Sequence, residues 1–168
     1  MKIALDTDCI IGLFRPSEKI HKDMCKIENF RKDGKIEVWV SLKTIVQVKD
    51  QDILTYVNSL SKLPNFPIGA WNDAVGSWNE QAGTWDDARK NENLQNRIHT
   101  LTKTGVDIRD RGILLDAILG SMDALITNDR GLSDCSPSKR ILKEYGINIL
   151  TPEKAISWIE NNGKGASS

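Results

Sequence analysis

The first fourteen residues, MKIALDTDCIIGLF, constrain the fold of this chain more than any other stretch. The apolar residues 3–5 run directly into two acids, Asp6 and Asp8, and a second apolar run follows at once. A short apolar run of this kind is typical of a buried parallel strand that ends in a turn. Ligands of open α/β sheets bind outside the carboxyl ends of the strands. Because a charge beside a dry core is costly without a partner, we expect the two acids to hold a cation or a bound phosphate.

Strand and helix patterns alternate along the rest of the chain. Strands are predicted at residues 3–5, 36–40, 124–126 and 147–150. Helices are predicted at residues 16–34, 41–48, 52–64, around 94–101, at 110–120, at 138–145 and from Thr151 onward. In the second of these, Ser41 is the predicted N-cap, and Ile45, Val46 and Val48 are expected to face the core. In the last, Pro152 lies in the first turn. This alternation predicts an α/β fold, a three-layer α/β/α sandwich around a central, mostly parallel sheet.

Residues 69–89 contain a repeat with a period of seven, GAWNDAV, GSWNEQA and GTWDDAR. Trp71, Trp78 and Trp85 each follow a glycine by two residues. On a helix the three indoles would form one stripe. We favour packing of this stripe onto the domain. A stacking platform for bases or a partner-binding surface is the alternative.

Composition restricts the classes of partner and compartment. The chain of 168 residues suffices for one domain, which we place at residues 1–162, with 163–168 as a frayed or expression-derived tail. Lys+Arg and Asp+Glu number 23 each, so nucleic-acid binding would need a local patch. The sequence has no apolar run of about 18 residues and no start typical of a signal peptide, so we expect neither a membrane span nor a signal peptide. Three cysteines without CxxC spacing favour a reducing, cytoplasmic location and argue against zinc.

Three acids are predicted to converge at one edge of the sheet. Asp6 and Asp129 follow strands that we expect to be parallel, and Asp110 begins the intervening helix. Carboxylates without histidine or thiolate partners favour a hard divalent cation, Mg²⁺ or Mn²⁺. Such a site can orient a phosphodiester, activate water and stabilise the leaving oxygen. The chain contains no GxSxG, P-loop, GxGxxG or HExxH motif that would favour another chemistry.

These acids lie in stretches that resemble the PIN-domain family of metal-dependent ribonucleases, which includes toxins of bacterial toxin–antitoxin pairs. The stretches are ALDTDCIIGLF, DRGILLDAILGSMDALITND and GINILTPEKAI. The resemblance implies that Asp6, Asp110 and Asp129 bind metal and that Asp8 replaces a common asparagine. Thr127 and Asn128 match the polar residues before the last acid. Relative to the compact family, residues 64–95 look like an insertion.

The resemblance also implies a function and partners. It implies cleavage of RNA, with an antitoxin protein as a partner if the chain is a toxin; a homodimer is a further partner to consider. Basic residues that could steer the RNA backbone are Lys43, Lys49, Arg109, Arg111 and Arg130.

One position departs from the family pattern. The family usually has a glutamate in the helix after the second strand, as in ISxxTxxEL, whereas VSLKTIVQV places Gln47 there. An amide lacks the negative charge that holds a divalent cation, although Asp50 or Asp8 could partly substitute. A weakened or inactive PIN-like binding module is therefore an alternative to the nuclease.

Other interpretations of the acids remain open. Asp110 could cap its helix. Asp116 could face the site or solvent, while Asp123 is expected to fix a turn and Asp134 to lie in a loop. The Asp6-x-Asp8 pattern is also similar to the start of haloacid-dehalogenase-like phosphohydrolases, in which the first acid is the nucleophile. We rank that interpretation below the nuclease, because residue 10 is Ile where that family has threonine or valine.

Overall fold

The computed structural model describes residues 1–63, 85–102, 106–133 and 135–163. The predicted insertion and the tryptophan repeat fall mostly outside these ranges. Of the three tryptophans of the repeat, only Trp85 lies inside, as the first residue of a helix. Asp134 and residues 164–168 also lie outside the described residues.

The described residues form a five-stranded sheet with the order β3-β2-β1-β4-β5, and all neighbouring strands are parallel. The strands are β1 (Lys2–Leu5), β2 (Glu37–Val40), β3 (Ser61–Lys62), β4 (Ala124–Ile126) and β5 (Asn148–Leu150). The first strand, β1, lies in the middle of the sheet. The next two strands, β2 and β3, are added on one side of it, and β4 and β5 are added on the other side. Because the winding direction reverses between β1 and β4, the carboxyl ends of these two strands flank the topological switch point of the sheet.

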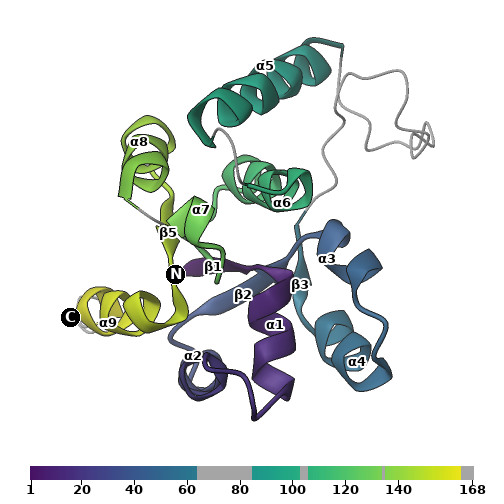
Figure 1. Cartoon of the computed structure of the whole chain (residues 1–168), viewed down its shortest axis with the longest axis vertical. Helices are drawn as coiled ribbons and strands as arrows, with labels where there is room; N and C mark the ends of the chain where they lie inside the picture. The colour runs from purple at the N-terminus through teal and green to yellow at the C-terminus, as the bar shows by residue number, and fades with distance from the viewer. Residues whose placement is uncertain (64–84, 103–105, 134, 164–168) are drawn as a thin grey trace.

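Helices cover both faces of this sheet, so the predicted three-layer α/β/α architecture is confirmed (Figure 1). One face carries α1 (Thr7–Phe14), α2 (His21–Lys32), α4 (Gln51–Ser59) and α9 (Pro152–Gly163). The other face carries α5 (Trp85–Thr102), α6 (Ile108–Leu119), α7 (Arg130–Ser133) and α8 (Cys135–Tyr145). The short helix α3 (Leu42–Gln47) follows β2 and contacts α6.

Side-chain alternation along the strands divides the core into two halves. Ile3 and Leu5 of β1 pack against the α1, α2, α4 and α9 side, whereas Ala4 packs against the opposite side. All three are at most 1% exposed. A central parallel strand is covered on both faces, which explains why its sequence is continuously apolar.

The four predicted strands are confirmed, but the sequence patterns missed three elements: α1, β3 and α7. We expected a turn after β1, and the chain instead enters α1 directly, with Asp6 as its N-cap. The strand β3 has only two residues, both polar. Its place is set by backbone pairing with β2, a non-local interaction that leaves no hydrophobic pattern.

Several local details of the helices also differ from the predictions. The helix α2 begins at His21 and not at Pro16. Asp50 caps α4 in place of Asp52, and Asp107 caps α6 in place of Asp110. In each case the N-cap is an aspartate, as predicted, but it lies two or three residues before the predicted one. Val46, which we expected in the core, is 84% exposed.

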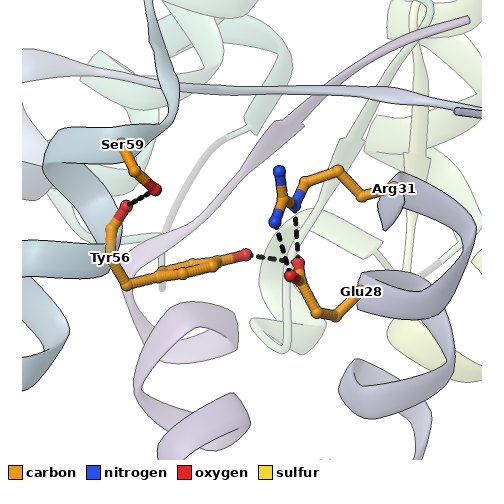
Figure 2. A network of polar contacts seen from close by, with 4 residues as sticks. All are labelled: Glu28, Arg31, Tyr56 and Ser59. Atoms are coloured by element: carbon orange, nitrogen blue, oxygen red, sulfur yellow. Dashed lines mark hydrogen bonds and ion pairs between the residues drawn. The ribbon is translucent and has the colours of Figure 1, made fainter. Parts of the chain in front are cut away.

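Figure 2 shows a polar network that joins α2 to α4. The Tyr56 hydroxyl of α4 donates to Glu28 Oε2 of α2 at 2.7 Å, and Arg31 donates to both Glu28 oxygens at 2.8 and 2.6 Å. Burial alone would raise the pKa of Glu28, but the bonds from Arg31 and Tyr56 outweigh it and hold that pKa below its ordinary value. The network therefore fixes the relative position of two helices that share one face of the sheet.

We expect Tyr56→Phe to lower the free energy of unfolding by about 1 to 2 kcal/mol, because a hydrogen bond to a partly buried carboxylate is lost while the ring is kept. The measurement is chemical denaturation. Ser59→Ala on the same helix is the matched control, since it removes only an exposed bond to the Tyr56 carbonyl. Equal losses in the two variants would contradict a specific role of the Tyr56 hydroxyl.

Candidate metal centre

Asp6 is held rigidly between the first and fourth strands. Its backbone N–H donates to the Ile126 carbonyl at 3.0 Å. Its carboxylate oxygens accept from the backbone N–H of Thr7 at 2.6 Å and from the Thr127 hydroxyl at 2.7 Å. The residue is only 4% exposed. A carboxylate with a donor on each oxygen has one fixed orientation, and here it lies at the switch point.

Thr127 links Asp6 to Asp129. Its hydroxyl donates to Asp6 and accepts from the backbone N–H of Asp129 at 3.0 Å, and the residue is fully buried. The Asp129 carboxylate accepts from the backbone N–H of Gly131 at 2.7 Å, in the first turn of α7. The predicted pairing of Asp6 with Asp129 therefore corresponds to a single hydrogen-bonded chain across β1 and β4.

Asp110 lies in the first turn of α6 and is electrostatically coupled to the other acids. Its pKa is raised to about 7, first by burial and then by the charges of Asp6, Asp129, Asp107 and Asp8. The pKa of Asp6 is also raised, mainly by burial, with Asp8 and Asp129 adding to the effect and the bonds from Thr127 and Thr7 opposing it. Four predicted site acids thus share one region of concentrated negative charge.

This region fits a hard divalent cation in its donor chemistry. All the acids offer oxygen. Burial is the main cause of the raised pKa values of Asp6 and Asp110, and the charges of the neighbouring acids add to it. The buried Thr7 hydroxyl, between Asp6 and Asp8, has no hydrogen-bond partner within the described residues. In those same residues, however, no three His, Cys, Asp or Glu side chains lie close enough together to hold a metal ion. The charge and the oxygen donors of these acids therefore suit a divalent cation, but their side chains are farther apart than ligands that all contact one ion.

The remaining candidates for the acidic set have different surroundings. Gln47 is the last residue of α3 and is half-buried. Asp50 accepts from the backbone N–H groups of Asp52 and Ile53 at 2.9 and 3.3 Å, so its carboxylate is already used as a helix cap. Asp8 is exposed in the first turn of α1. Asn128 is exposed, and its backbone N–H bonds the buried Cys9 thiol.

Asp116 is buried, which excludes the solvent-facing position, one of the two possibilities that we considered. Its partner Ser41 directly follows Val40 of β2, which pairs with Leu5, the residue before Asp6. Asp116 is 4% exposed and accepts from the Ser41 hydroxyl at 2.5 Å and from Lys43 Nζ at 2.8 Å on each oxygen. A Cβ atom at Gly112 would lie 2.9 Å from Lys43 Cδ, so the bare glycine gives the lysine stem its path across α6. Lys43, a candidate RNA contact, therefore has an internal partner.

The other basic candidates are distributed around the helix starts. Arg109 forms an exposed ion pair with Asp107 at 3.2 Å, and Arg111 contacts His99. Arg130 is exposed at the first position of α7, directly after Asp129, and Lys49 is exposed after α3. Asp123 lies at the opposite end of β4, where its carboxylate accepts from the Lys2 backbone N–H at 2.7 Å. This contact joins the start of β4 to the start of β1 and is not a bond within the preceding turn, which is where we expected it.

Sequence reasoning missed the Thr7 hydroxyl and the Ser41–Asp116–Lys43 group. Thr7 could have been noticed as the residue between the two first acids, whereas the Lys43–Asp116 contact spans 73 residues and leaves no local signal. None of the described helices has the length and apolarity needed to cross a membrane. Comparison with family models, curated proteins and solved structures finds no match to this chain.

Proposed function

We propose that the chain is a divalent-metal-dependent endoribonuclease of PIN type that hydrolyses RNA phosphodiester bonds. The observation that carries the proposal is the hydrogen-bonded chain Asp6–Thr127–Asp129 across the switch point of a parallel sheet. Asp110 adds a third carboxylate that is electrostatically coupled to both. Carboxylates gathered at this edge, where α/β folds bind their ligands, favour a cation and a phosphate substrate over other chemistry.

Each acid has a distinct part in this proposal. Asp6, Asp110 and Asp129, with Asp8, would hold Mg²⁺ or Mn²⁺. When bound, such a cation would supply Lewis acidity toward a phosphodiester and make a water more acidic. Thr127 holds Asp6 and the Asp129 backbone in place, which removes the cost of ordering them. Asp110, with a pKa of about 7, would release its proton as the charge of the site is neutralised.

The RNA backbone would be guided by exposed cations that are close in sequence to the candidate site residues. Arg130 directly follows Asp129, and Lys49 follows the helix that ends with Gln47. Arginine and lysine supply most phosphate contacts in nucleic-acid complexes. An antitoxin partner belongs to the same proposal and rests on the resemblance to the PIN family. A second copy of the chain is a further candidate partner, and the proposed cytoplasmic location rests on the cysteine pattern.

Calorimetric titration of Mn²⁺ followed by incubation with single-stranded RNA tests this function. We expect binding and cleavage in the wild-type chain, and the loss of both in an Asp6→Asn/Asp129→Asn double variant. Asp33→Asn is the matched control, because Asp33 is an exposed acid that precedes β2 at the opposite edge of the sheet. Binding without RNA cleavage, but with hydrolysis of a phosphate ester, would replace the nuclease by the phosphohydrolase. No binding at all would favour a metal-free binding module.

Gln47→Glu tests whether the site is weakened by the amide at this position. An added carboxylate should raise both Mn²⁺ affinity and RNA cleavage, because it supplies the charge that the family usually has there. Val46→Glu is the matched control, since the neighbouring residue on the same helix is 84% exposed. Equal responses of the two variants would contradict the placement of Gln47 beside the cation.

A further inference from the structure

Cys25 and His21 face each other one turn apart on α2, away from the acidic residues. The distance from Cys25 Sγ to His21 Nε2 is 3.6 Å. The other ring nitrogen, Nδ1, lies 3.0 Å from the carbonyl oxygen of Gly12 in α1. Cys25 and His21 are both partly exposed, unlike the fully buried Cys9. The arrangement combines a thiol, a nitrogen base and a group that orients the base.

The contact with Gly12 determines which ring nitrogen is free to accept a proton. A carbonyl oxygen can only accept, so Nδ1 of His21 must carry its hydrogen and donate it. In the neutral ring the lone pair therefore lies on Nε2, and the Cys25 thiol donates to it. After proton transfer, Nε2–H would donate to the thiolate. The same heavy-atom positions serve both states, so the transfer needs no rearrangement.

Close packing of two helices holds the imidazole in this orientation. A Cβ atom at Gly12 would lie 2.6 Å from two side-chain carbons of Ile20, the residue just before α2. The glycine thus lets α1 and α2 approach until its carbonyl reaches His21. A nucleophile hydrogen-bonded to a base, with the base oriented by a third group, is the arrangement that activates nucleophilic side chains.

We propose that Cys25 is a site of oxidation by hydroperoxides and that His21 activates it by accepting the thiol proton. In the reaction the sulfur attacks one peroxide oxygen, an S–O bond forms and the O–O bond breaks. The leaving hydroxide of hydrogen peroxide, or the alkoxide of an organic hydroperoxide, takes the proton from His21 and becomes water or an alcohol. Cys25 is oxidised to a sulfenic acid and the peroxide is reduced, so the balance needs no further reactant.

Cys9 provides a matched control within the same chain. It is fully buried, and burial together with the charges of Asp6 and Asp8 raises its pKa well above the ordinary value. A buried thiol of this kind is unreactive. The sequence separates the three cysteines into different tryptic peptides, because lysine or arginine residues lie on both sides of each. Mass spectrometry can therefore assign a modification to one cysteine.

The experiment treats the folded chain with hydrogen peroxide and traps sulfenic acid with dimedone. We expect Cys25 to be labelled at least about tenfold faster than Cys9, and faster than Cys25 itself in the chain unfolded by guanidinium chloride. His21→Asn keeps an amide donor for the Gly12 carbonyl but removes the base, and should slow labelling at least about tenfold.

Two results would overturn the proposal. One is a Cys25 that reacts more slowly in the folded chain than in the unfolded chain, a comparison that needs no variant. The other is a His21→Asn variant that folds, as judged by circular dichroism, and reacts as fast as the wild type or faster. Greater exposure of the sulfur would speed the reaction, so a slower rate identifies loss of the base and not loss of packing.

Discussion

Lys43→Met is expected to lower the free energy of unfolding by about 3 to 5 kcal/mol, the cost of leaving a buried carboxylate without its cation. The Asp116 side chain is 6% exposed, and Lys43 Nζ contacts both of its oxygens at 2.8 Å. Without the lysine, only the Ser41 hydroxyl would still donate to this carboxylate. Chemical denaturation measures the loss. Lys49→Met is the control, because Lys49 is exposed and its replacement should change stability by less than about 0.5 kcal/mol.

Removal of the carboxylate in Asp116→Leu should lower the free energy of unfolding by less than Lys43→Met does. The Lys43 side chain is 35% exposed, so in Asp116→Leu its ammonium group can turn into solvent. A double variant, Lys43→Met/Asp116→Leu, should recover much of the stability lost in Lys43→Met, because a buried ion pair can be replaced by apolar residues of similar volume. Additive losses in the double variant would contradict the contact as the source of the effect.

Asp110→Asn is expected to stabilise the metal-free chain by about 1 to 2 kcal/mol at pH 8. A rise of the Asp110 pKa from 3.8 to about 7 corresponds to about 4 kcal/mol, and solvent screening of this half-buried group reduces that value. The folded wild type keeps a proton that the unfolded chain releases between about pH 4 and pH 7, so its stability falls as the pH rises through this window. The amide has no such proton, so the gain should vanish near pH 4.

Mn²⁺ separates this effect from ordinary surface stabilisation. Neutralisation of the acids should stabilise the wild type by a concentration-dependent amount and stabilise Asp110→Asn less. Asp107→Asn is the matched control on the same helix. There hydrogen bonds from Arg109 lower the pKa, so loss of the charge should destabilise the chain slightly at pH 8, while the amide oxygen still caps α6. A stability of Asp110→Asn equal to that of wild type at every pH would contradict the coupling of the four acids.

Sequence patterns were sufficient to predict the central strands of the sheet. The strands β1 and β4 are buried on both faces, so their runs of apolar residues are visible without any knowledge of their neighbours. The same logic predicted that Asp6 and Asp129 would emerge side by side, because parallel neighbours end at the same edge. The two residues are joined through Thr127, as that prediction requires.

Elements fixed by tertiary contacts could not be predicted in this way. The helix α1 is apolar on most sides, since Thr7, Cys9, Ile10 and Gly12 are all buried, so it lacks the alternating face that identifies a helix. Val46 is apolar but exposed, against the rule used to orient α3. The burial of Asp116 depends on a lysine that is 73 residues away in the sequence. These features follow from packing between distant segments, which a single sequence does not reveal.

The strand order has a consequence for the growing polypeptide on the ribosome. Among the five described strands the central one, β1, is made first, whereas its neighbour β4 is made fourth, and Asp6 meets Thr127 across 121 residues. At 5 to 20 residues per second, roughly 6 to 24 seconds of synthesis separate the two partners. Until then one edge of β1 stays unpaired and the acidic residues stay apart. The candidate centre therefore cannot form until residues 127–129 have been made, after helices α1 to α6.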